Sequence, residues 1–342
     1  MTGTRPETQD ASGRLLRDLR ISVTDRCNFR CTYCMPKHIF QSHYRFIPRS
    51  DLLSFEEVAR VAGLFAALGV RKIRITGGEP LVRRDVERLV AMLAKVEGID
   101  DISLTTNGSL LTREKAQTLR DAGLRRLNVS LDALDDETFH AINDVSFPVS
   151  RVLDAIDNAA TAGLSPVKVN MVVKAGLNEG DIVPMARQFR ETPHIVRFIE
   201  FMDVGCTNGW RMDDVVPARE IVARIRKEFP MRPVDPNYPG EVARRWRYLD
   251  GGGEIGVISS VTEPFCGGCG RARLSASGSL YTCLFATGGH DLRAMLRSGG
   301  SDTEILDRLR AIWSRRTDRY SEIRGERTGK PLSRVEMSHI GG

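Results

Sequence analysis

The sequence contains no complete set of four neighbouring metal ligands, although it has seven cysteines in 342 residues. Six of them form two triplets, Cys27, Cys31 and Cys34 (C-x3-C-x2-C) and Cys266, Cys269 and Cys283 (C-x2-C-x13-C). A structural zinc site is closed by four protein ligands. A cubane iron–sulfur cluster normally has one thiolate on each iron, so three cysteines leave one iron open to a small molecule. The two triplets therefore predict two clusters, each able to bind a ligand.

Further metal ligands are missing as well. The six histidines show no H-x-x-x-H pair or similar spacing, and no fourth cysteine lies near the first triplet. These absences disfavour the two alternatives for that triplet, a zinc knuckle and a thioredoxin-like pair. Phe29, Tyr33 and Met35 are placed to screen a cluster there from water. Cys206 lies outside both triplets and is predicted to be a small buried hydrophobic residue.

The chain also lacks a long apolar run and an apolar leader. Its longest apolar stretch, Val61 to Val70, is too short to cross a bilayer. The N-terminus, MTGTRPETQDASG, is polar and has no secretory h-region. Clustered cysteines in such a chain favour metal binding over disulfides. We expect a cytoplasmic protein without a membrane partner.

Aromatic residues make up only 6% of the chain, which leaves little material for stacking nucleic-acid bases. The net charge of +6 and the pI of about 9.0 favour an anionic partner, either a nucleic acid or a phosphorylated small molecule. One alternative is therefore a nucleic-acid-binding protein that is stabilised by bound metal and uses its basic surface. Basic residues crowd the C-terminal region, where a solvated, mobile tail is expected for most of them: Arg315, Arg316, Arg319, Arg324, Arg327 and Lys330.

Two glycine-rich motifs lack the context that a nucleotide site needs. Gly251, Gly253 and Gly256 spell G-x-G-x-x-G but precede a strand-like run rather than a helix. The segment 325–330 is one residue short of a phosphate loop, and Pro331 stands where Ser or Thr is required. A phosphorylated ligand would therefore be held by arginine and lysine side chains.

Short β-branched runs alternate with amphipathic stretches over the first two-thirds of the chain. The predicted strands are Leu19–Val23, Lys72–Ile75, Asp101–Thr105, Arg125–Ser130, Val167–Val173 and Val196–Phe201. The predicted helices are Phe55–Leu68, Val86–Val96, Arg113–Ala122, Val152–Ala162 and Asp181–Arg190. This order implies parallel strands with right-handed crossovers. Since eight strands close a full barrel, six predict an α/β fold with an open, partial (β/α)6 barrel of TIM type.

The rest of the chain has a different pattern. A segment rich in proline and turn residues, 232–240, is predicted to separate the barrel from a C-terminal α+β domain that closes its side. We expect a flexible N-terminus at 1–13, the barrel at 14–230, the second-cluster domain at 231–314 and a basic tail ending in Gly-Gly at 315–342. Val216–Phe229 is expected to be a helix bridging the two parts.

Polar residues follow five successive predicted strands. They are Thr76 to Glu79, Thr106 to Gly108, Ser130 with Asp132, Lys174, and Glu200 to Asp203. Loops after strands are commonly polar, but five in a row favour a ligand-binding mouth at the C-terminal ends of the strands, where barrel enzymes carry their active sites.

The motif RCNFRCTYC after the first strand, with TGGEP after the second, resembles the radical S-adenosylmethionine superfamily. The second motif, FCGGCGRARLSASGSLYTCLF, resembles the GTP 3′,8-cyclase family of molybdenum cofactor biosynthesis, as do LNVSLDAL, RFIEFM and IGVISSVTEPFC. This resemblance implies a lyase that converts GTP to 3′,8-cyclo-7,8-dihydro-GTP, using two 4Fe–4S clusters and S-adenosylmethionine. A deoxyadenosyl radical would take hydrogen from ribose C3′, and C3′ would then bond to guanine C8.

The resemblance also implies roles for individual residues. The two triplets, Cys27, Cys31 and Cys34, and Cys266, Cys269 and Cys283, would bind the first and second clusters. The S-adenosylmethionine site would comprise Tyr33, Gly78, Ser130 and Met202. The GTP contacts would be Arg20, Arg74, Thr106, Lys168, Arg271, Ala272 and Arg273. Arg271 and Arg273, together with Gly341 and Gly342 of the tail, would act in catalysis.

The implied partners are GTP, a downstream cyclic pyranopterin monophosphate synthase, a reductase or flavodoxin-type electron donor, and a second copy of the chain in a homodimer. No nucleic-acid partner is expected. The alternative within radical chemistry is a peptide-modifying enzyme with an auxiliary cluster. Such enzymes tend to carry more cysteines, and the Arg-x-Arg pair at 271 and 273 has no role in them.

Overall fold

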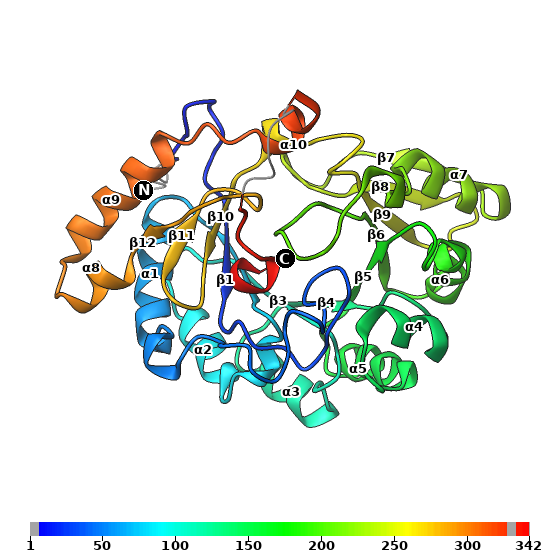
Figure 1. The fold of residues 1–342 in the computed structure, drawn as a ribbon, viewed down its shortest axis with the longest axis horizontal. Coiled ribbons are helices and arrows are strands. Elements are labelled where there is room, and N and C mark those ends of the chain that lie inside the picture. The colour runs from blue at the N-terminus through cyan, green and yellow to red at the C-terminus, as the bar shows by residue number, and fades with distance from the viewer. Residues whose placement is uncertain (1–6, 327–332, 342) are drawn as a thin grey trace.

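Six parallel strands form the centre of the computed structural model, which describes residues 7–326 and 333–341. They are β1 (Asp18–Ser22), β2 (Lys72–Thr76), β3 (Asp101–Thr106), β4 (Arg126–Ser130), β5 (Lys168–Val173) and β6 (Ile195–Glu200). Each pairs with the next in parallel, and together they curve into an open barrel (Figure 1). The six predicted strands and the open-barrel fold are confirmed.

Helices cover the outer face of these strands (Figure 1). They are α1 (Phe55–Ala67), α2 (Val86–Leu93), α3 (Arg113–Asp121), α4 (Asp136–Asn143), α5 (Val149–Thr161) and α6 (Ile182–Phe189). Alternate strand residues such as Leu19 and Ile21 are fully buried against them, so the residues between, such as Arg20, face the barrel interior. The sequence pattern did not predict α4, which is capped by Asp135, whose carboxylate accepts the Thr138 N–H.

The C-terminal strands extend both edges of this sheet rather than forming a sheet of their own. On one edge β9 (Glu254–Ile258) pairs in parallel with β6, followed by β8 (Arg244–Tyr248) and β7 (Met231–Val234). On the other, β10 (Arg271–Leu274) pairs in parallel with β1, followed by β11 (Ser279–Tyr281) and β12 (His290–Asp291). Residues 232–234 of the predicted boundary segment belong to β7, because Pro233 is tolerated in this edge strand.

The remaining helices flank these added strands. They are α7 (Ala218–Glu228), which is the predicted bridging helix, α8 (Arg293–Arg297), α9 (Asp302–Ser314), α10 (Tyr320–Ile323) and α11 (Met337–Ile340). Among the described residues, no helix has the length and apolar character needed to cross a membrane.

Three expectations about flexible or buried segments are corrected. The described part of the N-terminal segment is anchored, because Asp10 is buried and pairs with Arg14 and Arg316. Arg316 does not belong to a solvated tail, since its side chain is only 2% exposed. Cys206 is exposed rather than buried, because it lies in a surface loop after β6.

The other basic residues of the C-terminal region differ in their exposure to solvent. Arg315 and Arg319 are exposed, as a solvated segment predicts. Arg324 is half-buried and forms an ion pair with Asp203 at 3.0 Å. Arg327 and Lys330 lie outside the described residues, so their expected solvation stays a prediction.

Candidate active site

One cavity at the C-terminal ends of the barrel strands is lined by all six cysteines of the two triplets. The first triplet lies in the loop after β1, and the second spans the short 3-10 helix η5 (Cys266–Gly268) and the segment after β11. Because β10 pairs with β1, the second triplet is brought across from the first. Two motifs more than 200 residues apart in the sequence therefore face the same space.

The loop of the first triplet is held from outside by α4, the helix that the sequence pattern missed. The N–H groups of Arg30 and Thr32 donate to the carbonyls of Asn143 and Ile142, each at 2.9 Å. The Arg30 guanidinium closes the loop by donating to the carbonyls of Cys27, Phe29 and Phe40. These contacts fix the backbone that carries the three sulfurs.

Gly77 and Gly78 let the loop after β2 lie directly on the loop that carries the first triplet. A Cβ on Gly78 would lie 2.3 Å from the carbonyl oxygen of Arg26, and one on Gly77 would lie 2.6 Å from that of Thr24. The Gly78 N–H donates to Thr24 at 2.7 Å. These two glycines therefore allow two backbone segments to approach closely, and Gly78 also lines the cavity.

Glu79 is a buried carboxylate that joins the loops after β2 and β3. It accepts hydrogen bonds from the Thr106 hydroxyl and the Asn107 N–H, both at 2.7 Å. Burial raises its pKa to about 7, against the lowering effect of these donors. Thr106 lines the cavity as predicted, but its hydroxyl is already used in holding Glu79.

Asp132 orients Tyr33 at the cavity wall. The Tyr33 hydroxyl donates to Asp132 at 2.7 Å, and the other carboxylate oxygen accepts the Val172 N–H at 2.8 Å. Burial raises the pKa of Asp132 to about 6. Ser130 and Met202 line the same cavity, so the four residues expected at the S-adenosylmethionine site are brought together.

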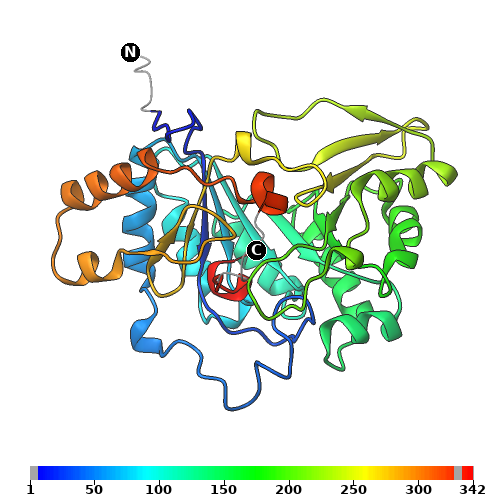
Figure 2. The same ribbon diagram turned by 45° about the horizontal axis from the view of Figure 1, so that its top comes forward.

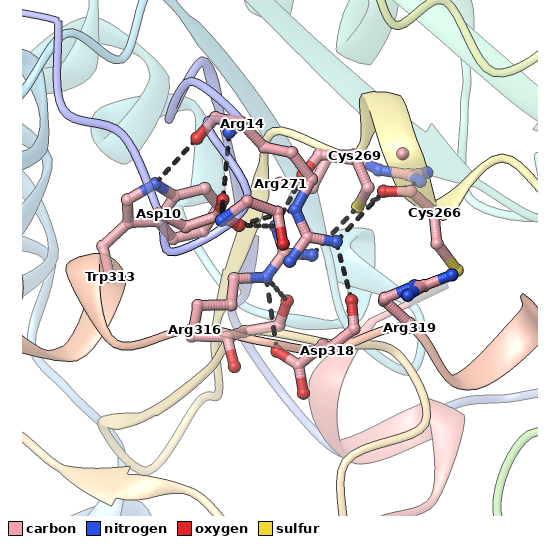
Figure 3. A network of polar contacts seen from close by, with 12 residues as sticks. Asp10, Arg14, Cys266, Cys269, Arg271, Trp313, Arg316, Asp318 and Arg319 are labelled. Carbon is pink, nitrogen blue, oxygen red and sulfur yellow. Dashed lines mark hydrogen bonds and ion pairs between the residues drawn. The ribbon is translucent and has the colours of Figure 1, made fainter. Parts of the chain in front are cut away.

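Two arginines contact Cys269 of the second triplet. Arg316 donates to the Cys269 sulfur at 3.3 Å and to its carbonyl at 2.6 Å, and Arg271 donates to the same sulfur at 3.4 Å (Figure 3). Burial alone would raise the pKa of Cys269, but these two guanidinium groups lower it to about 6. They favour the thiolate, which is the metal-binding form. Sequence reasoning missed Arg316, because nothing in its run of basic residues distinguished it.

The barrel interior is strongly cationic. Arg20 lies beside Arg74 on β2 and beside Arg273 on β10, and all three line the cavity. Burial, with the neighbouring arginines, lowers the pKa of Arg273 to about 9 and that of Arg20 well below its usual range. Arg197 of β6 also lines the cavity and was missed by sequence reasoning, although it lies on the inward face of a predicted strand. A polyanion in this cavity would relieve the repulsion among these groups.

Two predicted GTP contacts do not line the cavity. Ala272 is fully buried in the hydrophobic core, because strand alternation turns it away from Arg271 and Arg273. Lys168 lies at the start of β5, away from the strand ends. Burial, then the neighbouring Arg197 above all, lowers its pKa to about 7, so it belongs to the same cationic group.

The C-terminal segment reaches into the cavity from α11, and both views place it over the barrel opening (Figures 1 and 2). The Arg273 guanidinium donates to the carbonyl of Gly341. Gly341 has φ +73°, and a Cβ there would lie 2.1 Å from Cγ2 of Thr76. Only glycine fits both the conformation and the space. Gly342 lies outside the described residues.

The donor sets fit iron–sulfur clusters. Each triplet presents three sulfurs to the same cavity, and the N–H groups of Phe29 and Phe285 donate to the sulfurs of Cys27 and Cys283. Hydrogen bonds of this kind tune iron–sulfur clusters.

Two family models together match most of the chain. The Radical SAM superfamily model matches residues 21–189, and the Molybdenum Cofactor Synthesis C model matches residues 194–322. The first range holds the first triplet and the second range holds the other triplet. The second model also begins before β6, so it includes the last barrel strand.

Curated relatives match almost the whole chain. The GTP 3′,8-cyclase of Acidothermus cellulolyticus is 53% identical over 358 residues, covering 98% of this chain and 99% of that protein. The GTP 3′,8-cyclase of Staphylococcus aureus is 49% identical over 339 residues, with the same two coverages of 98% and 99%. Among solved structures, Streptococcus suis SuiB bound to S-adenosylmethionine has a TM-score of 0.59 and 14% identity, covering 87% of this chain and 69% of SuiB. That last likeness concerns the fold alone.

Proposed function

The chain belongs to the GTP 3′,8-cyclase family, and from that membership we propose which of its residues carry the reaction. It is a radical S-adenosylmethionine enzyme that converts GTP to 3′,8-cyclo-7,8-dihydro-GTP, the first step of molybdenum cofactor biosynthesis. The observation that carries the assignment of residues is the shared cavity, in which both cysteine triplets face a group of buried arginines. The peptide-modifying alternative is not favoured.

We assign the first 4Fe–4S cluster to Cys27, Cys31 and Cys34 and the second to Cys266, Cys269 and Cys283. When bound and reduced, the first cluster supplies the electron that splits S-adenosylmethionine into methionine and a 5′-deoxyadenosyl radical. Tyr33, Gly78, Ser130 and Met202 would surround S-adenosylmethionine. The support for Tyr33 is its fixed orientation, since Asp132 accepts its hydroxyl hydrogen at 2.7 Å.

The triphosphate of GTP would lie on the cationic interior. Guanidinium groups fork onto phosphate oxygens, so we assign this role to Arg20, Arg74, Arg271 and Arg273, with Arg197 and Lys168 adding charge. The support is their mutual repulsion, which lowers the pKa of Lys168 to about 7 after the larger effect of burial. Phosphate would restore the charged form of that lysine. Ala272 has no side-chain role in this assignment, and Thr106 would act through Glu79.

The protein's remaining task is to hold the ribose and exclude water. Taking hydrogen from C3′ and joining C3′ to C8 both require a substrate fixed in one geometry. Gly341, held by Arg273 over the barrel opening, would close the cavity on its open side. We propose the same closing role for Gly342. Arg271 and Arg273 would thus both act on the triphosphate, and Arg273 would also act on closure through Gly341.

We propose five further features that follow from the family. The domain division is a barrel over 14–230 and a second-cluster part over 231–314, with terminal segments at 1–13 and 315–342. The enzyme works in the cytoplasm as a homodimer. A cyclic pyranopterin monophosphate synthase takes the product. A reductase or flavodoxin-type protein supplies electrons.

The test is an anaerobic assay of reconstituted, reduced protein with S-adenosylmethionine, with and without GTP. GTP-dependent 5′-deoxyadenosine together with a cyclised nucleotide is the expected result. Equal deoxyadenosine with and without GTP, and no nucleotide product, would keep the radical chemistry but remove GTP as the substrate.

A further inference from the structure

The segment that carries the first triplet is unusually basic. The 24 residues from Arg26 to Arg49 contain five arginines or lysines and no aspartate or glutamate. Over the whole chain, 44 acidic residues stand against 50 basic ones. The excess of positive charge is therefore concentrated next to the cysteines, on the loop between β1 and α1, which forms the lower edge of the view in Figure 2.

Aromatic contacts gather part of this segment into one surface. The rings of Phe40 and Tyr44 lie 4.6 Å apart, those of Tyr44 and Phe46 lie 4.9 Å apart, and the Arg26 guanidinium lies 5.3 Å from the centre of the Phe46 ring. Arg26, Tyr44 and Arg45 are all exposed. We call the set Arg26, Lys37, Tyr44 and Arg45 the outer patch.

The cations of the outer patch are open to a partner. Among residues 7–326 and 333–341, no carboxylate lies within ion-pair distance of Arg26 or Arg45. Lys37 is 66% exposed and pairs with Asp144 only at 3.6 Å. Exposed pairs of this kind are weak and easily exchanged for a partner's carboxylate.

The outer patch is covalently close to the first triplet. Arg26 is bonded to Cys27, and Lys37 follows Cys34 by three residues, a span of about 10 Å at most. The sulfurs themselves face the inner cavity, which substrate and the C-terminal segment would fill. Because α4 covers the loop at Arg30 and Thr32, the outer patch is an exposed part of this segment that lies close in sequence to the sulfurs.

We propose that the outer patch is the docking surface for an acidic, one-electron donor protein of the flavodoxin or ferredoxin type. This inference rests on the proposed function, because only a reducible cluster needs such a donor. The donor is oxidised by one electron and the first cluster is reduced by one, with no bond formed or broken at the patch. Complementary charge raises the rate of encounter, and the exposed ring of Tyr44 supplies an apolar contact.

The test compares two reductants on reconstituted holoenzyme with S-adenosylmethionine and GTP. One is reduced flavodoxin regenerated by its NADPH-dependent reductase, and the other is dithionite, which needs no docking surface. The variant is Arg26→Glu with Arg45→Glu. The control is Arg219→Glu with Lys227→Glu, a matched charge reversal at two exposed positions of α7.

The patch variant should form deoxyadenosine about tenfold more slowly with flavodoxin and at an unchanged rate with dithionite. The control should match the wild type with both reductants. The wild-type rate with flavodoxin should fall as salt is raised, and that of the patch variant should respond less.

Equal rates with flavodoxin in the wild type and the patch variant would overturn the proposal. An equal loss with both reductants would also overturn it, since the patch would then serve the fold or the active site. Loss of oligonucleotide binding in the patch variant, with flavodoxin-driven turnover intact, would assign the patch to nucleic acid instead. A wild type that cleaves S-adenosylmethionine with dithionite but makes no cyclised nucleotide would count against the proposed function, not against the docking surface.

Discussion

Arg273 of β10 donates a hydrogen bond to the carbonyl of Gly341, four positions beyond the start of α11. Arg273 therefore lies among the buried arginines and also holds the segment that closes the barrel opening. A ligand that binds this guanidinium would also affect the position of the C-terminal segment, because the ligand and Gly341 would contact the same side chain. This relationship links substrate binding to closure and underlies the first prediction.

Removing Gly341 and Gly342 should abolish cyclisation while the protein stays folded with its iron bound. The single change Gly341→Ala should lower cyclisation strongly, because its Cβ would meet Cγ2 of Thr76 at 2.1 Å. Gly209→Ala is the matched control, since Gly209 also has a positive φ but no heavy atom within 4 Å of an added Cβ. Product yield is the readout. Full activity of the truncated protein would refute a catalytic role for this segment.

Asp203 is predicted to fasten the C-terminal segments to the loop after β6. It accepts hydrogen bonds from the Tyr320 hydroxyl, from Arg324 at 3.0 Å and from Arg334 at 2.8 Å. Asp203→Asn should remove about 1–3 kcal/mol from this anchor and lower cyclisation more than cleavage of S-adenosylmethionine. Limited proteolysis should cut the C-terminal segment sooner. Asp250→Asn, which breaks an exposed pair with Arg190, should change neither measurement.

Gly78→Ala should disrupt the contact between the loops after β1 and β2. The added Cβ would lie 2.3 Å from the Arg26 carbonyl oxygen, so one loop must move. We expect S-adenosylmethionine binding to weaken at least tenfold, which corresponds to about 1.4 kcal/mol. Gly63→Ala in α1 is the control, because its Cβ would meet nothing within 4 Å and Ala favours the helix. Equal affinities measured by equilibrium dialysis would contradict this account.

Arg271→Ala and Arg273→Ala should each weaken GTP binding and leave S-adenosylmethionine cleavage measurable. A guanidinium that forks onto phosphate typically contributes about 1.5–3 kcal/mol, or more than tenfold in affinity. Arg315→Ala serves as a control because that arginine is exposed. Unchanged GTP affinity in both variants would remove the phosphate role assigned to this pair.

Cys283→Ala should lose the second cluster and keep the first. Iron and sulfide analysis should give about half of the wild-type iron content, because each triplet is expected to hold one cluster of four irons. The first triplet and its supporting contacts with α4 lie on other elements and should be unaffected. A variant that keeps all its iron would contradict the assignment of Cys283.

Periodicity alone predicted the barrel, because strands such as β2 alternate the buried Ile73 and Ile75 with polar residues such as the inward Arg74. The place of β7 could not be predicted in this way, since Pro233 reads as a breaker unless the strand is known to be an edge. Helix α4 is short, so its sequence pattern is weak. Its function of supporting the loop of the first triplet depends on contacts that only the structure shows. Local patterns describe an element well, but they do not say which distant segment packs against it.

The same distinction applies to the active site. The triplets were evident because cysteine spacing is a local property of the sequence. Arg316 and Arg197 were not, since their roles depend on long-range contacts with Cys269 and with the barrel interior. Ala272 was assigned along with its neighbours, although strand alternation points it into the core. Asp10 anchors the N-terminal segment by pairing with Arg316, which lies far along the chain, so its sequence neighbours could not reveal this role.

The central claim is that one cavity holds both the radical source and the ribose of GTP. The most direct measurement is transfer of label from GTP deuterated at C3′, followed by mass spectrometry of the 5′-deoxyadenosine. We predict that one deuterium appears in deoxyadenosine for each cyclised nucleotide formed. Deoxyadenosine without deuterium, formed alongside the nucleotide product, would contradict the account, because the hydrogen would then have come from elsewhere.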